Sequence, residues 1–172
     1  CLNQNYPADK LSVLVVSDGS TDRTHDIVNG FNDARVQLLA CPTRRGKAAC
    51  LNDGVAHTQA PIIVFTDARQ RLHPQAVAKL VANFSDPSIG AVSGELEFEQ
   101  DDGTPFAEGI GAYWLYEKFI RNREALTGSV VGVTGALYAI RRQCFNPIPA
   151  ETILDDVAIP MLAAMQGWRV SF

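Results

Sequence analysis

Two uninterrupted runs of apolar residues, at 13–16 and 62–65, form the strongest pattern in the chain. Each run is rich in β-branched residues and too short for a buried helix, which is typical of strands buried on both faces of a parallel sheet. Between the runs we expect a helix from residue 20 or 21 to about 31, a strand over 36–40 and a helix over 46–58. This βαβαβ order predicts an α/β domain with a mostly parallel sheet flanked by helices.

The second half of the chain also contains predicted helices and strands, but its apolar positions are less regularly spaced. The spacing of apolar positions predicts helices over 74–84, 112–126 and 155–167, an extended segment over 89–99 and a strand over 136–140. Turn residues at 101–105 predict an exposed loop. With 172 residues, 47% of them apolar, the chain can bury one substantial core. We therefore expect a single domain over residues 1–172.

Composition narrows the classes of partner. A formal net charge of -4 gives no general attraction for a nucleic-acid backbone. The four cysteines have neither zinc-site spacing nor the density of a disulfide scaffold. No apolar run approaches the roughly 20 residues that cross a bilayer. We expect no nucleic-acid partner, and membrane contact only through segments outside this chain. The start at Cys1, without methionine, suggests an excerpt of a longer protein whose domain is incomplete at both ends.

Both strong strands lead into a carboxylate, Asp18 after the first and Asp67 after the second. Ligands of open parallel sheets bind at the edge formed by the carboxyl ends of the strands, so the two acids are candidates for one site. The alternative is that each aspartate only starts a turn or caps the next helix.

The turn at 17–22, with the sequence SDGSTD, is the more specific of the two strand ends. Gly19 permits a sharp turn without a Cβ clash, and the polar residues after it can cap a helix. Asp18 is then available for a nucleobase or a ribose. A phosphate-binding loop of the Walker type and a G-x-G-x-x-G motif are both absent. Nucleotide binding would therefore use acids with a divalent cation, or basic side chains.

Five motifs in a fixed order resemble the family 2 glycosyltransferases of the GT-A fold, over nearly the whole chain. They are 17–22 (SDGSTD), 46–52 (GKAACLN), 66–68 (TDA), 132–142 and 154–156 (LDD). The resemblance implies a GT-A-like, Rossmann-like sheet. It also implies an inverting transfer of a sugar from a nucleoside-diphosphate donor, normally UDP-linked, to a hydroxyl acceptor. That acceptor would be a glycan or a lipid-linked molecule, and the domain would be the cytoplasmic part of a protein with possible membrane anchors.

The resemblance also assigns roles to residues. Asp18 would contact the nucleobase, and Asp67 the ribose or the metal-diphosphate group. Asp156 would be the general base, since displacement at an anomeric carbon needs a carboxylate that takes the acceptor proton. Gly135 and Asp155 would lie on the acceptor side. Helix capping remains the alternative for the two adjacent aspartates, and a packing turn for Gly135.

One departure from the family pattern concerns the metal. The family generally has an acid-x-acid triplet that helps to hold Mg²⁺ or Mn²⁺, whereas this chain has Asp67-Ala68-Arg69. Arg69 would repel a divalent ion but can neutralise diphosphate oxygens itself. We expect either reduced metal dependence or a metal held by Asp67 together with donor phosphates. Lys47, which opens a predicted helix, is a second candidate for the diphosphate, or else part of a solvated basic loop.

Two other functions fit parts of the pattern. A sugar-phosphate nucleotidyltransferase has a similar architecture but needs a glycine-rich basic loop on its first strand, and no such loop is visible. A nucleotide-binding or assembly domain without catalysis would tolerate Arg69. Donor hydrolysis or transfer would distinguish an enzyme from such a binding domain.

Overall fold

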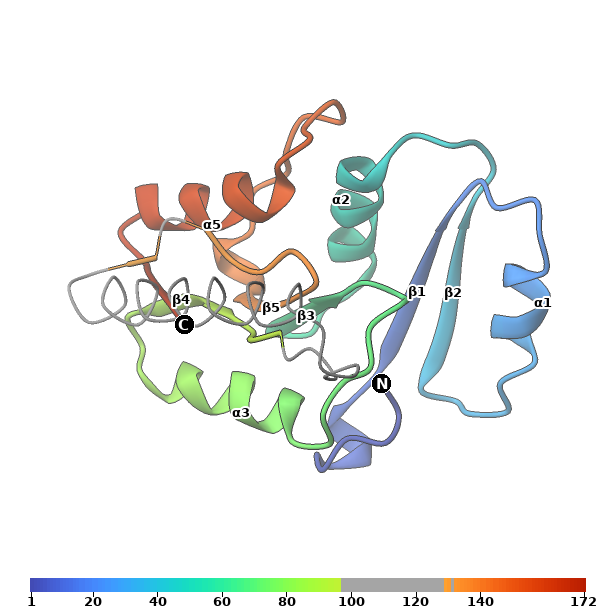
Figure 1. Cartoon of the computed structure of the whole chain (residues 1–172), viewed down its shortest axis with the longest axis horizontal. Helices are drawn as coiled ribbons and strands as arrows, with labels where there is room; N and C mark the ends of the chain where they lie inside the picture. The colour runs from blue at the N-terminus through green and yellow to red at the C-terminus, as the bar shows by residue number, and fades with distance from the viewer. Residues whose placement is uncertain (97–128, 131) are drawn as a thin grey trace, which may run out of the picture.

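The computed structural model describes residues 1–96, 129–130 and 132–172 of the chain. Its strands form two hydrogen-bonded ladders (Figure 1). In the first ladder, β1 (Val13–Asp18) and β2 (Val36–Cys41) are parallel, with Asp18 opposite Cys41 at their carboxyl ends. Both strands were expected from the apolar pattern, and both extend one or two residues further than predicted.

The second ladder has four strands in the order β3-β5-β4-β6. Its members are β3 (Ile62–Thr66), β4 (Ile89–Ser93), β5 (Leu137–Arg141) and β6 (Arg169–Ser171). β4 and β6 are parallel, whereas β5 is antiparallel to both of its neighbours. β3, β4 and β6 therefore run in the same direction, as expected for a mostly parallel sheet, and β5 runs in the opposite direction.

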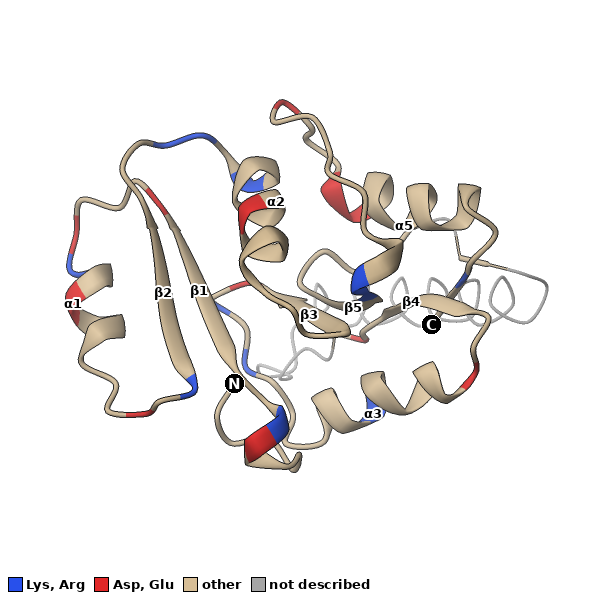
Figure 2. Ribbon diagram, turned by 180° about the vertical axis from the view of Figure 1, so that it is seen from behind, with Lys and Arg blue, Asp and Glu red and all other residues tan. Residues whose placement is uncertain are grey.

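Helices cover the strands on both sides. They are α1 (Thr24–Asn29), α2 (Lys47–His57), α3 (Ala76–Ala82) and α5 (Asp155–Met165). Figures 1 and 2 show α3 on one face of the four-stranded ladder and α5 on the other. α1 starts later than predicted because Asp22 Oδ1 accepts the backbone N–H of Thr24, at 3.0 Å, and so defines the first turn.

Two apolar clusters follow from this layering. The cluster on the α5 side includes Tyr138, Ile140 and Ile159, which are at most 1% exposed. The cluster on the α3 side includes Leu80, Phe84 and Val92. Because side chains alternate between the two faces of a strand, β5 contributes to both clusters. The burial on both faces that was predicted for the runs at 13–16 and 62–65 is wrong, because β1 and β3 are mostly half-buried beside the space between them. The fully buried strands are instead β4 and most of β5.

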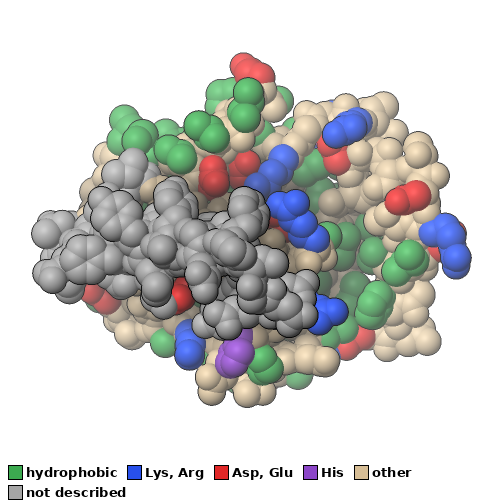
Figure 3. All heavy atoms as spheres, in the orientation of Figure 1, with side chains coloured by type: hydrophobic (Ala, Val, Ile, Leu, Met, Phe, Trp, Pro, Cys, Tyr) green, Lys and Arg blue, Asp and Glu red, His purple; other side chains and the backbone are tan. Residues whose placement is uncertain are grey.

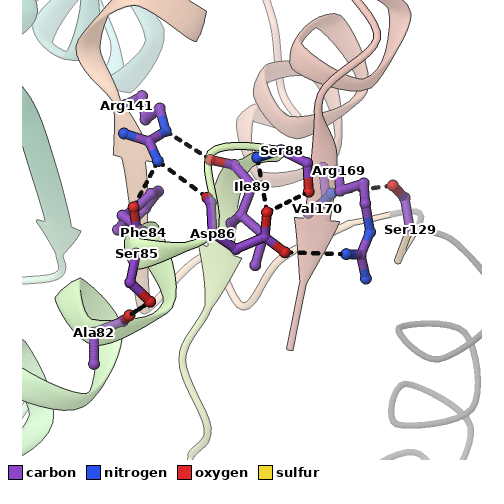
Figure 4. Close-up of polar contacts among 10 residues, drawn as sticks. All are labelled: Ala82, Phe84, Ser85, Asp86, Ser88, Ile89, Ser129, Arg141, Arg169 and Val170. Atoms are coloured by element: carbon purple, nitrogen blue, oxygen red, sulfur yellow. Dashed lines mark hydrogen bonds and ion pairs between the residues drawn. The ribbon is translucent and has the colours of Figure 1, made fainter.

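Arg141, at the end of β5, fastens the turn between α3 and β4 (Figure 4). Its guanidinium donates to the carbonyl oxygens of Ile89 at 2.8 Å, Phe84 at 2.7 Å and Asp86 at 3.1 Å. It also lies 5.2 Å from the centre of the Phe84 ring. One half-buried guanidinium thereby donates to three backbone carbonyl groups around this turn.

A cavity of about 390 Å³ separates the two ladders, with β1 on one side and β3 on the other. Among the described residues, β1 pairs only with β2, and β3 only with β5. Apolar side chains of both strands line the cavity, and Lys47 and Asp67 lie at its wall as well. Two of the predicted site residues thus border one space.

Some predictions concern residues outside this description: the end of the extended segment at 97–99, the loop at 101–105 and the helix over 112–126. The expectation of a single domain likewise stays a prediction. In the described part of the chain, every helix is too short or too polar to cross a membrane. All four cysteines are free thiols, and burial raises the pKa of Cys50 to about 12.

Candidate active site

Asp18 is the last residue of β1, and its carboxylate accepts hydrogen bonds from the backbone that leads into α2. Oδ1 accepts the backbone N–H of Arg45 at 2.7 Å, and Oδ2 accepts that of Gly46 at 2.8 Å. The hydrogen bond from Arg45 is the main cause that lowers the pKa of Asp18 below its usual 3.8. The sequence suggested a carboxylate free for a nucleotide; in the structure each oxygen accepts a backbone N–H, and the neighbouring Cys50 side chain also lowers the pKa of this carboxyl.

Gly19 allows this arrangement. Its φ is +66°, and a Cβ at this position would lie 2.6 Å from the backbone nitrogen of Arg44. A side chain would therefore push the loop at 43–46 away from Asp18. Asp18 and Gly19 thus act together: Asp18 binds the loop, and Gly19 lets the loop come close.

Lys47 and Asp155 form an ion pair between α2 and α5. Lys47 Nζ lies 2.9 Å from Asp155 Oδ2; the lysine side chain is 50% exposed and the aspartate 6%. This pair lacks hydrogen-bond alignment, and Oδ2 has no hydrogen bond from any other group. The predicted diphosphate ligand and a predicted acceptor-side residue are therefore in direct contact, which sequence spacing did not indicate.

Asp156 lies against Gly135. A Cβ at Gly135 would be 2.7 Å from Asp156 Oδ2. The backbone carbonyl of Asp156 accepts the N–H of Val133 at 3.0 Å, so the segment before β5 wraps the start of α5. Leu154 is the N-cap residue of α5 and no side-chain hydrogen bond caps the helix, but Asp155 and Asp156 both lie in its first turn, where the helix dipole favours a negative charge.

Tyr138 is a buried neighbour of these acids that the sequence analysis missed. It is 1% exposed, its ring lies 4.8 Å from that of Phe65, and its hydroxyl has no hydrogen-bond partner among the described residues. Burial, followed by the charges of Asp155 and Asp156, raises the pKa of this phenol. The only signal in the sequence was one hydroxyl within an otherwise apolar strand.

Asp67 follows β3 and pairs with Arg69. The guanidinium Nη2 lies 3.3 Å from Asp67 Oδ2, and the two side chains are 82% and 28% exposed, respectively. Across the described residues, no group of three or more His, Cys, Asp or Glu side chains is placed to hold a metal. One carboxylate beside a guanidinium does not fit a cation site made by the protein alone.

Basic and acidic side chains lie side by side on this face of the molecule, where α2 approaches α5 (Figure 3). The structure therefore brings Lys47, Asp155, Asp156 and Gly135 together, and joins Asp18 to them through the start of α2. Asp67 and Arg69 form a separate pair, with Asp67 at the cavity that Lys47 also borders.

Strands flanked by helices, with acids at the ends of β1 and β3 and at the start of α5, form a Rossmann-like α/β domain with polar groups at the strand ends. The chain belongs to glycosyl transferase family 2, whose model matches residues 1–148. Family membership sets aside the nucleotidyltransferase alternative.

Two similar proteins are also described as glycosyltransferases or glycolipid synthases. A probable glycosyltransferase of Bacillus subtilis, YdaM, is 36% identical over 99% of this chain and 43% of its own length. The β-monoglucosyldiacylglycerol synthase of Synechocystis is 26% identical over 96% of this chain and 36% of its own length. The chain therefore spans less than half of these relatives.

Solved structures show the same fold. The mannosyltransferase PcManGT of Pyrobaculum calidifontis, in complex with GDP-Man and Mn²⁺, is 29% identical with a TM-score of 0.82, over 98% of this chain and 47% of that one. TarS of S. aureus, residues 1–349, is 19% identical with a TM-score of 0.72, over 98% of this chain and 50% of that one. The predicted GT-A-like fold is confirmed.

Proposed function

We propose that this domain belongs to an inverting glycosyltransferase that moves a sugar from a nucleoside-diphosphate donor to a hydroxyl acceptor, in the synthesis of a glycan or a glycolipid. The observation that carries the proposal is the carboxylate of Asp156, which is partly exposed and rests against a glycine that leaves room for it. Such a carboxylate, beside an open backbone segment, is suited to take a proton from an acceptor hydroxyl.

The reaction is a direct displacement. The acceptor oxygen attacks the anomeric carbon as Asp156 removes its proton, and the bond from that carbon to the diphosphate oxygen breaks on the opposite face. The nucleoside diphosphate leaves with the electron pair, and the configuration at the anomeric carbon inverts. Lys47 and Arg69 would offset the negative charge of the leaving group, since charge-assisted hydrogen bonds to phosphate oxygens are strong.

Donor binding is assigned to Asp18, Lys47, Asp67 and Arg69. Uracil is the base that the family resemblance implies, and guanine is the alternative because PcManGT is in complex with GDP-Man. The same complex contains Mn²⁺, so a metal is plausible in the family. Asp67 alone does not provide a site for it, and no step proposed here passes through a metal.

The test uses the full-length protein with UDP- and GDP-sugars. We expect Asp156→Asn to abolish transfer and donor hydrolysis while nucleotide affinity, measured by calorimetry, stays close to that of the wild type. Asp9→Asn removes the same charge at an exposed site in the short 3-10 helix Ala8–Lys10 and is the control. Full activity of Asp156→Asn would exclude Asp156 as the base, and the absence of nucleotide binding by the wild-type protein would overturn the whole proposal.

A further inference from the structure

Asn52 joins α2 to the segment that leads into α5. Its side-chain Nδ2 donates to the carbonyl of Ile148 at 2.7 Å, and its Oδ1 accepts the backbone N–H of the same residue at 3.0 Å. One amide side chain thus satisfies both backbone groups of Ile148, as a neighbouring strand would. Ile148 lies in no helix or strand that could provide these bonds.

The contact is partly buried and supported by packing. Ile148 is 4% exposed and lies in the same apolar cluster as Ala48 and Ile159. Ala48 is one turn before Asn52, so both residues lie on the same face of α2. Buried backbone groups that lose their partners destabilise their surroundings, which makes the Asn52 amide hard to replace at this point.

The segment held by Asn52 carries the two acids of the site. Six residues after Ile148 the chain reaches Leu154, and Asp155 and Asp156 follow directly. Two further contacts connect this segment with α2: the ion pair of Lys47 with Asp155 at 2.9 Å, and the approach of Ala150 to Gly46, where a Cβ would lie 3.8 Å from the carbonyl oxygen.

The opposite side of the same helix start holds the donor-side acid. Gly46 N–H donates to Asp18 Oδ2 at 2.8 Å. Helix α2 is therefore a common support, with Asp18 bound at its amino end and the segment at 148–155 bound through Lys47 and Asn52. A shift of that segment would move Asp156 relative to a donor held near Asp18.

We propose that Asn52 is a positioning residue for glycosyl transfer: it fixes the segment before α5 and thereby the Asp156 carboxylate, without touching either substrate. This role rests on the proposed function. It predicts that a change at Asn52 lowers the rate of the chemical step and leaves donor binding intact, because the bonds of Asp18 to the start of α2 do not involve Asn52.

The experiment compares Asn52→Ala and Asn52→Asp in the full-length protein with the same changes at Asn83. Asn83 is a matched control because its Nδ2 also donates to a backbone carbonyl, that of Lys79 at 2.9 Å, at an exposed position after α3. Steady-state kinetics give kcat and the donor KM, and hydrogen exchange with mass spectrometry follows the amides of residues 145–154. All assays are made well below the melting temperature of each variant.

For Asn52→Ala we expect kcat to fall roughly 10- to 100-fold, as for other small displacements of a reacting group. The donor KM should stay within about twofold, since an interaction needed only for the chemical step alters kcat alone. The amide of Ile148 loses its acceptor and should exchange about tenfold faster or more. The Asn83 variants should match the wild type in all three measurements.

Asn52→Asp adds a pH signature. The ionised carboxylate places an acceptor opposite the Ile148 carbonyl, whereas the protonated acid restores a donor there. Its kcat relative to that of Asn52→Ala should therefore rise as pH falls toward about 4. A purely structural amide would give losses that follow only the fraction of folded protein, without this rise.

Three outcomes would overturn the inference: wild-type kcat in Asn52→Ala, a raised donor KM with unchanged kcat, or unchanged exchange at Ile148. These results require an active wild-type enzyme. If the wild-type protein transfers no sugar from either donor, the proposed function fails first, and the exchange data then report only a structural bond.

Discussion

The Asp156 carboxylate occupies space that a side chain at Gly135 would fill. A Cβ at Gly135 would lie 2.7 Å from Asp156 Oδ2 and 3.2 Å from Asp156 Cβ. At Gly132, in the same segment, the nearest atom to a new Cβ is a methyl of Val157 at 3.4 Å, which is ordinary contact. The two glycines therefore differ sharply in how much they tolerate one added carbon.

We expect Gly135→Ala to lower kcat roughly 10- to 100-fold, because the added carbon displaces the reacting carboxylate. Overpacking should also destabilise the fold by about 1–3 kcal/mol. Steady-state kinetics and urea unfolding measure the two effects, and nucleotide affinity should be unchanged. Gly132→Ala is the matched control and should retain nearly all activity. A Gly135→Ala enzyme with wild-type kcat would contradict the assignment of the reacting acid to this position.

At the residue scale, the sequence indicated which groups carry chemistry but not what each of them contacts. Lys47 and Asp155 were assigned to opposite sides of the site, yet they form one ion pair. Asn52 lay in a quoted motif without a role, and its partner Ile148 lies far along the chain. Such pairs depend on how helices pack, and residue types alone do not encode that packing.

At the scale of elements, β1 is fastened to α2 through a charge. The Asp18 carboxylate accepts two backbone N–H groups that precede α2, and it is held there in its ionised form. These bonds lower the pKa of Asp18 in the folded protein below its usual 3.8. A lowered pKa in the folded state means that the carboxylate stabilises the fold above the unfolded-state value. That contribution is lost as pH falls through the folded value.

We therefore expect Asp18→Asn to be less stable than the wild type at neutral pH, because the amide NH₂ group faces a backbone donor. The difference in unfolding free energy should shrink as pH falls below about 3.8 and the wild-type carboxyl takes up its proton. Urea titrations of both proteins over this range measure it. Asp9→Asn, at an exposed site, should leave the neutral-pH urea midpoint near the wild-type value. A difference that grows on acidification would contradict the expected sign.

The elements themselves were largely predictable, because runs of apolar residues report burial directly. β1, β2, β3 and β5 were all expected within two residues of their ends. Direction was not predictable: the pattern of β5 is apolar whether the strand runs with or against its neighbours, and β5 enters between β3 and β4 from late in the sequence. α1 was predicted three or four residues too early, since three polar residues in a row each satisfy the capping rule.

At the scale of the whole molecule, the order of motifs carried more information than any single motif. Five motifs in a fixed order predicted the family, which the match over residues 1–148 confirms. The cavity between β1 and β3 was not predictable, because both strands read as ordinary buried strands. The net charge of -4 also gives no indication that two basic side chains, Lys47 and Arg69, lie among the acids proposed to bind the donor.

In the proposed reaction, Arg69 would neutralise part of the charge of the donor diphosphate. Its guanidinium is 82% exposed and only 3.3 Å from Asp67, where a second acid would favour a divalent cation. If Arg69 carries that role, chelation with EDTA should leave the wild-type enzyme with a substantial part of its activity. Arg69→Ala should weaken donor binding roughly tenfold, while Lys79→Ala, an equal charge change on α3, should not.

Arg69→Asp reverses the local charge and restores an acid-x-acid triplet. We expect this variant to bind Mn²⁺ more tightly than the wild type in calorimetric titrations, because two carboxylates replace an acid paired with a cation. Its transfer activity should then depend on added Mn²⁺ or Mg²⁺. The contrary result for the wild-type enzyme is complete loss of activity on chelation, restored only by these ions. It would assign the diphosphate charge to a metal at Asp67 and reduce Arg69 to a surface residue.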